Sequence, residues 1–148
     1  MTNKHWLLMA LITLAGGLGL YCNRDWFANP PIQISHRFHA FAARFTDGAG
    51  TVPLLFEFNR KLKLTSIQVV PVADFQTNKY PHLLWHLVSD SNSVPTKGFL
   101  YGMDVPGMRP AYHGAAPDPP YLGVKYRLLI KAGSLKAQHD FVLEPPAP

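Results

Sequence analysis

Residues 124–132 read VKYRLLIKA, residues 133–135 read GSL, and residues 136–143 read KAQHDFVL. In the first run Tyr126, Leu128 and Ile130 share one face, and Arg127 and Lys131 share the other. This period-two alternation is typical of a strand with one buried face and one wet face. Two such runs around a short glycine-containing loop predict a β-hairpin.

Further apolar runs of strand length recur upstream, and turn residues separate them. All 14 prolines lie at or after Pro30, which favours short strands with stiff connections over long helices. Seven short strands predict an all-β fold, a sandwich of about seven strands at residues 32–144. Residues 145–148 are predicted to be a disordered tail. The predicted strands are residues 32–38, 53–58, 62–72, 83–89, 97–101, 124–132 and 136–143.

The segment Pro119–Leu128, PPYLGVKYRL, resembles the entry to the sixth strand of fibronectin type III and immunoglobulin-like domains. In those families a tyrosine hydroxyl bonds back to upstream backbone and pins the corner. The resemblance implies this role for Tyr126, and it implies that Trp85 is the core tryptophan of the third strand. It concerns the fold, because such sandwiches host many unrelated functions.

The first 25 residues form a separate apolar segment. Residues 6–22 read WLLMALITLAGGLGLYC, 17 residues without a charge, which as a helix span roughly 25 Å. Lys4 precedes the run, whereas Arg24 and Asp25 follow it and cancel. This charge distribution predicts a membrane anchor at residues 1–25 with the N-terminus inside, a spacer at residues 26–31, and the domain outside the cytoplasm.

Two other fates are open for this segment. Gly17 and Gly19 are small residues, as signal-peptide cleavage requires, and cleavage would make the domain a secreted protein. Lipidation at Cys22 is the third possibility, although Tyr21 stands where lipoprotein signals have a small residue.

The cysteine count and the charge distribution restrict the compartment and the partners. Cys22 is the single cysteine, and the chain has no Asn-x-Ser/Thr sequon, so both features fit a bacterial periplasmic or cell-surface protein. The formal net charge is +5, yet only Arg60, Lys61 and Lys63 cluster in the exported part. We therefore expect a membrane contact through residues 6–22 and no nucleic-acid partner.

The histidines upstream of the last hairpin make poor metal sites by spacing. On a helix, His82 and His86 could bind one metal ion together. In a strand, four residues span about 13 Å, so the two imidazoles lie too far apart to share a metal. His36 and His39 are close in sequence, with no carboxylate or cysteine nearby to complete a site. We expect neither pair to bind a metal.

Residues 102–121 form a long loop with five prolines. Long ordered loops often bind something, so we expect an envelope protein as the partner of this loop. Its contact surface is predicted to comprise Met103, Met108, Arg109, Tyr112 and His113. An alternative is a Cu(I) carrier that uses Met103, Met108 and His113 as soft ligands. A third interpretation is a proline-stiffened crossover packed on the sandwich edge.

Catalytic motifs are scarce in this chain. There is no Gly-x-Ser-x-Gly elbow, no phosphate-binding glycine loop, and only two glutamates, Glu57 and Glu144. We expect no enzymatic activity and no cofactor. The sequence instead predicts a membrane-anchored, envelope-facing module that binds protein or has a structural role.

Overall fold

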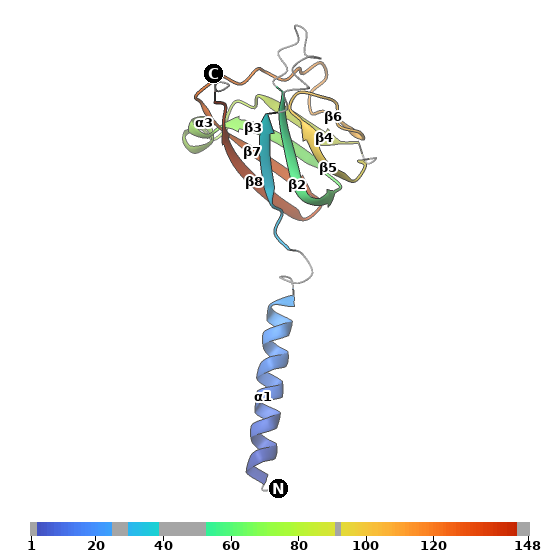
Figure 1. Cartoon of the computed structure of the whole chain (residues 1–148), viewed down its shortest axis with the longest axis vertical. Helices are drawn as coiled ribbons and strands as arrows, with labels where there is room; N and C mark the ends of the chain where they lie inside the picture. The colour runs from blue at the N-terminus through green and yellow to red at the C-terminus, as the bar shows by residue number, and fades with distance from the viewer. Residues whose placement is uncertain (1–2, 25–29, 39–52, 91–92, 145–148) are drawn as a thin grey trace. The chain divides into compact units, whose positions relative to one another are not determined.

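The computed structural model describes residues 3–24, 30–38, 53–90 and 93–144 (Figure 1). The chain separates into two compact units, Met1–Pro31 and Ile32–Pro148. The described residues of the first unit form one helix, α1, and those of the second form eight strands and the short helix α3.

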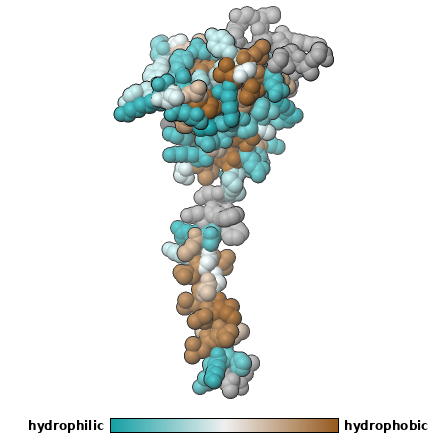
Figure 2. Space-filling view, turned by 90° about the vertical axis from the view of Figure 1, so that its left-hand side faces the viewer, coloured by the Kyte–Doolittle hydropathy of each residue, from teal (hydrophilic) through white to brown (hydrophobic). Residues whose placement is uncertain are grey.

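Helix α1 (Asn3–Cys22) consists of 20 residues and buries none of its side chains. Its hydrophobic surface lies between more hydrophilic ends (Figure 2). A helix of this length measures about 30 Å, the thickness of a bilayer's hydrocarbon core. The helix is long and apolar enough to cross a membrane, and a signal sequence has the same properties. The predicted N-terminal apolar helix is therefore confirmed.

The second unit contains two antiparallel sheets, which confirms the prediction of a two-sheet β fold. The three-stranded sheet has the order β1-β2-β5, formed by β1 (Ile34–Phe38), β2 (Leu54–Leu62) and β5 (Thr96–Leu100). The five-stranded sheet has the order β6-β4-β3-β7-β8. Its strands are β3 (Ser66–Pro71), β4 (Trp85–Ser89), β6 (Met108–Pro110), β7 (Lys125–Ala132) and β8 (Leu135–Val142).

Strands β7 and β8 form the predicted hairpin. They pair in continuous register from Lys125↔Val142 to Ala132↔Leu135, which leaves a two-residue turn. Gly133 in this turn has φ 64°, a left-handed conformation that glycine adopts without steric cost. Turn chemistry and hydrophobic alternation thus agree at this element, and the hairpin prediction is confirmed.

The core lies between the inward faces of the two sheets. The five-stranded sheet contributes apolar side chains at alternate positions, among them Val69, Leu128 and Ile130, each at most 1% exposed. The three-stranded sheet contributes Phe56 and Phe99, whose ring centroids lie 5.5 Å apart. Among the described residues no polar or charged side chain is fully buried. Apolar burial therefore dominates the stability of this unit.

Strands β2 and β5 approach each other closely at Gly98. A Cβ atom at this position would lie 2.4 Å from the carbonyl oxygen of Phe56 and 3.3 Å from Cα of Glu57. The register between the two strands shifts between Glu57 and Leu62. A residue without a side chain is therefore required where the strands meet.

Three elements differ from the sequence prediction. Strand β2 continues to Leu62, whereas the predicted strand stops at residue 58. The predicted strand 62–72 is shorter, because Pro71 has no N–H for the ladder and precedes the helix α3 (Val72–Thr77). The loop at residues 102–121 contains the short strand β6. The predictions for residues 26–29 of the spacer, for His39 and for the tail at 145–148 lie outside the described residues.

Candidate functional site

The loop at residues 102–121 runs along the edge of strand β4. Its strand β6 pairs with β4 in the register Leu87↔Pro110 to Ser89↔Met108. Further along, the N–H of Ala111 donates to the carbonyl of His86 at 3.0 Å. The N–H of Asp118 donates to the carbonyl of Leu84 at 2.9 Å. Backbone hydrogen bonds thus hold the loop on the sheet edge, which is the arrangement of a proline-stiffened crossover.

The five residues predicted to form a contact surface separate into two groups. Met108 is half-buried and packs against the core. The other four are exposed, with Tyr112 at 69% and Met103 at 49%. The ring of Tyr112 also meets His86 edge-on, with the centroids 6.3 Å apart. We call the four exposed residues the loop surface: Met103, Arg109, Tyr112 and His113.

The copper alternative needs Met103, Met108 and His113 to face one ion. Met108 instead directs its side chain toward the core, so its thioether takes part in packing. Among the described residues, no group of three or more His, Cys, Asp or Glu side chains is placed to hold a metal ion. The alternative stays a hypothesis, with two exposed soft ligands, Met103 and His113.

Next to the loop lies a hollow of about 350 Å³, lined by His82, Asp118 and Tyr121 among others. Nε2 of His82 lies 2.9 Å from Oδ2 of Asp118, and both side chains are exposed. His86 is on strand β4, where its Nε2 lies 3.0 Å from Nε2 of Gln68. The two histidines therefore have different partners, and the helical spacing of a shared metal is not formed.

Tyr126 and Trp85, the two residues assigned structural roles, are both buried. The hydroxyl of Tyr126 accepts a hydrogen bond of 2.8 Å from the backbone N–H of Tyr121. The ring of Trp85 packs against Tyr101, with the centroids 5.2 Å apart. Trp85 lies on β4, the fourth strand, and not on the third strand as the resemblance implies. The third strand, β3, presents aliphatic Val69 opposite Trp85.

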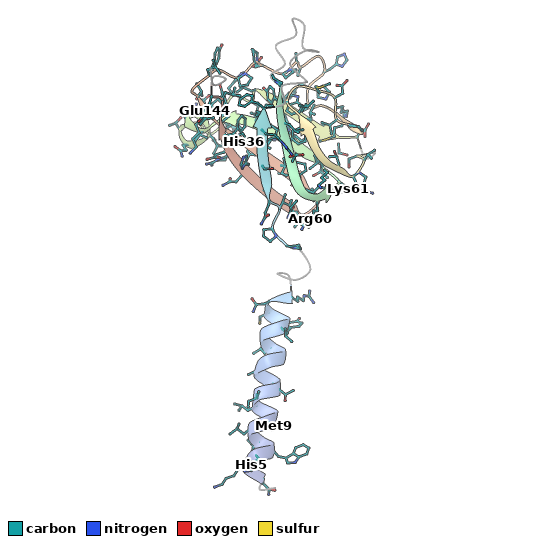
Figure 3. The ribbon with its side chains drawn as sticks, viewed as in Figure 1. His5, Met9, His36, Arg60, Lys61 and Glu144 are labelled. Carbon is teal, nitrogen blue, oxygen red and sulfur yellow. The ribbon has the colours of Figure 1, made fainter. Side chains whose placement is uncertain are left out.

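A histidine pair that sequence reasoning missed joins the two sheets. Nδ1 of His36 lies 2.7 Å from Nε2 of His139, although the residues are 103 positions apart. His36 lies on β1, an outer strand of the three-stranded sheet (Figure 3), and His139 lies on β8, an outer strand of the five-stranded sheet. The ring of His36 also lies 5.9 Å from that of Phe141. We call this contact between β1 and β8 the seam.

Charged side chains surround the seam in paired form. A hollow of about 420 Å³ beside His36 is lined by Arg37, Lys125, Asp140 and Glu144 among others. The guanidinium of Arg37 donates from Nε to the carboxylate of Glu57 at 2.8 Å. The carboxylate of Asp140 pairs with the guanidinium of Arg127 and the ammonium group of Lys125.

Asp140 on β8 accepts two hydrogen bonds from Arg127 on β7, from Nε at 2.6 Å and from Nη2 at 2.9 Å. Nζ of Lys125 lies 3.6 Å from the same carboxylate. The hydrogen bonds from Arg127 lower the pKa of Asp140, and burial opposes this shift. Arg127 and Asp140 thus form a bidentate ion pair that links β7 to β8 on the outer face of the hairpin.

Burial also lowers the pKa of the two partly buried histidines. The pKa of His139 is lowered first by burial and then by the charge of His36, while Asp140 opposes the shift. The pKa of His86 is lowered by burial and by the charge of Lys131. Nδ1 of His86 is buried and has no hydrogen-bond partner among the described residues. Both imidazoles are therefore favoured in the neutral form near pH 7.

The signal for His139 is present in the sequence, but its partner is not. His139 has the same parity along β8 as the buried Phe141, so it belongs to the inward face. The neighbour of His36 in the sequence is His39, which lies outside the described residues, so local spacing does not point to His139 as the partner of His36. No protein-family model, curated protein or solved structure matches the chain.

Proposed function

We propose that the chain is a membrane-anchored β-sandwich module that binds a protein partner outside the cytoplasm through the loop surface. The observation that carries the proposal is the loop's combination of backbone fixation and side-chain exposure. Tyr112 is 69% exposed on a loop whose backbone is tied to β4 before it and to Leu84, the residue that precedes β4, after it. A fixed loop loses little conformational freedom when it binds, which favours affinity.

The residue types of the loop surface support a protein partner. Tyrosine, methionine and arginine are enriched at the centres of protein interfaces. Met103, Arg109 and Tyr112 supply one of each within ten positions of the chain, and all three are exposed. Met103 and Tyr112 are thus large side chains of the kinds found at interfaces, and the loop leaves both exposed.

The anchor half of the proposal rests on α1 and on the charges before it. The helix exposes its large apolar side chains on all sides, including Trp6, Leu11 and Leu18 at more than 60%. Such a helix needs a lipid environment or removal by a peptidase. Lys4 on the N-terminal side favours an orientation with the domain outside. The mass of the mature protein from a membrane fraction distinguishes anchor, cleavage and lipidation at Cys22.

We further propose that the sandwich is of the immunoglobulin-like type. In immunoglobulin domains strands A, B and E are neighbours in one sheet, and strands C, F and G are neighbours in the other. The orders β1-β2-β5 and β3-β7-β8 have this adjacency when β6 is treated as an insertion before the sixth strand. The hydrogen bond between Tyr121 and the hydroxyl of Tyr126 also supports it.

Site-specific photo-crosslinking on the full-length protein in native membranes tests the binding proposal. A crosslinker at position 112 is expected to capture one discrete partner, and the Arg109→Ala exchange is expected to reduce that capture severalfold. A crosslinker at position 80 is the matched control, because Tyr80 is 84% exposed but lies outside the loop. Equal capture from both positions, or capture of nothing from position 112, contradicts the proposal.

A further inference from the structure

We propose that His36 and His139 form a proton-operated clamp between β1 and β8, closed near neutral pH and open when both imidazoles are protonated. The clamp is independent of the proposed binding partner. It acts at the seam, where the edge of one sheet meets the edge of the other.

The clamp follows from the number of protons that the two facing nitrogens can hold. Nδ1 of His36 and Nε2 of His139 are 2.7 Å apart, a distance that requires one hydrogen between them. A neutral imidazole has one N–H and one acceptor nitrogen, whereas an imidazolium has two N–H groups and no acceptor. The bond therefore exists when the pair is neutral or carries one extra proton. It cannot exist when both rings are charged.

The doubly charged state also places two positive charges in contact. Like charges at this separation repel, and screening by solvent is limited on the side of His139, which is half-buried, whereas His36 is exposed. The first extra proton is tolerated because a shared N–H···N bond with one charged ring is strengthened. The second proton removes the hydrogen bond and also adds the repulsion between the two rings. Opening of the clamp therefore coincides with the second protonation of the pair.

Neighbouring charges offset the doubly protonated pair only in part, because Asp140 favours the charged form of His139 but is shared with two cations. Arg37 on β1 pairs with Glu57 on β2, and Asp140 pairs with Arg127 and Lys125. The carboxylates of Glu57 and Asp140 are thus already matched by cations. Glu144 lines the hollow beside His36, but it is exposed and its effect is screened by solvent. The seam therefore has no buried acid of its own to hold two imidazolium ions together within the described residues.

The seam depends on side chains and not on a strand ladder. In the described residues β1 pairs with β2 and β8 pairs with β7, and no backbone hydrogen bonds join β1 to β8. Contacts across the seam include the histidine pair and the ring contact from His36 to Phe141 at 5.9 Å. Loss of the pair is expected to loosen β1 and expose the edge of the core at Phe141, whose ring packs edge-on against Phe56.

A second histidine contact, between His82 and Asp118, differs from the seam because the partner of the imidazole is a carboxylate. His82 lies 2.9 Å from the carboxylate of Asp118, and a carboxylate accepts a hydrogen bond from either form of an imidazole. Loss of the acceptor nitrogen therefore breaks the hydrogen bond at the seam but not the contact beside the loop. This difference supplies an internal control, because a general acid effect would act on both pairs alike.

Hydrogen exchange of the full-length protein in detergent micelles, followed by mass spectrometry at pH 7.5 and pH 5.0, tests the clamp. After correction for intrinsic exchange rates, the amides of β1 are expected to lose about tenfold protection at the lower pH. The amides of β3 and β7, in the centre of the five-stranded sheet, are expected to keep theirs.

Two variants make the test specific. In His36→Gln the amide can donate to neutral His139 or accept from its protonated form, so β1 is expected to stay protected at both pH values. His82→Gln is the matched control and is expected to keep the tenfold loss. Equal protection of β1 at both pH values in the unmodified protein overturns the clamp, as does a pH response that persists in His36→Gln. Protection of β1 that rises on addition of Zn²⁺ or Cu²⁺, and only when both histidines are present, also overturns it in favour of a metal site.

Discussion

The buried hydroxyl of Tyr126 accepts the backbone N–H of Tyr121 across 2.8 Å, which ties the end of the loop to the first residues of β7. The ring of Tyr126 is 1% exposed and lies 5.8 Å from that of Phe141 on β8. A second hydroxyl acts similarly, because Tyr101 donates to the carbonyl of Asp118 at 2.6 Å. The hydroxyl groups of two core tyrosines, Tyr101 and Tyr126, thus hold the end of the loop in place.

Replacing Tyr126 with phenylalanine tests this connection. The exchange keeps the packed ring but leaves the N–H of Tyr121 without its acceptor, which we expect to lower the free energy of unfolding by about 1–2 kcal/mol. Urea unfolding of the full chain in detergent measures the change. Tyr112→Phe is the matched control, because that hydroxyl is on an exposed side chain and its removal is expected to leave stability unchanged. Equal stability of Tyr126→Phe and the unmodified protein contradicts the expectation.

Gly98 provides a test of the close approach between β2 and β5. The methyl group of Gly98→Ala would lie 2.4 Å from a backbone oxygen, so the two strands must separate to admit it. We expect a loss of about 1–3 kcal/mol in the free energy of unfolding, as for other overpacked sites. Thermal unfolding checks the prediction, with Lys97→Ala on the same strand as the control. An alanine that is tolerated within a few tenths of a kcal/mol would show that the strands yield there.

The parts of the fold that were predicted correctly are those determined by local pattern. The β7–β8 hairpin combines alternation, as in Tyr126 and Arg127, with a glycine where the turn needs a left-handed residue. Strand β6 escaped prediction because its strand character comes from pairing with β4, which a run of three residues ending in Pro110 does not reveal. Helix α3 escaped because the apolar run continues through Pro71 into Val72.

The two candidate sites, the loop surface and the seam, also differ in how far local sequence indicates them. The loop surface could be proposed from the sequence because its residues are neighbours in the chain and five prolines mark the loop, and its role in binding stays a prediction. The seam depends on a contact between residues 103 positions apart on different sheets, and sheet packing brings them together. Parity along β8 places His139 inside, but no local rule names His36 as its partner.

Asp140 gives the outer face of the hairpin a pH dependence that can be measured. Its folded-state pKa is below the usual 3.8, chiefly through the hydrogen bonds from Arg127. Its stabilising contribution is therefore complete above pH 3.8 and is lost as the pH falls through the folded pKa. Asp140→Asn is expected to lose about 1–2 kcal/mol at pH 7, because the variant lacks the charge that Arg127 binds.

The difference between Asp140→Asn and the unmodified protein is then expected to narrow as the pH falls below 3.8. Urea unfolding over a series of pH values shows whether the two curves converge. Asp104→Asn, which alters an exposed carboxyl in the loop, is expected to follow the unmodified protein throughout. Parallel curves for Asp140→Asn at all pH values would show that the carboxylate does not carry the effect.

The proposed role of α1 as a membrane anchor is tested by a charge at the centre of the helix. Leu14 is 74% exposed in the apolar run, and Leu14→Arg places a guanidinium at the centre of the bilayer at a cost of about 3 kcal/mol. We expect a large fraction of the variant to leave the membrane pellet after alkaline extraction, because 17 uncharged residues leave little apolar surplus to offset that cost. Leu14→Phe keeps the position apolar and is expected to pellet like the unmodified protein. A variant Leu14→Arg that stays fully in the pellet would contradict a spanning helix, since a span of this length cannot absorb the charge by snorkelling from its midpoint.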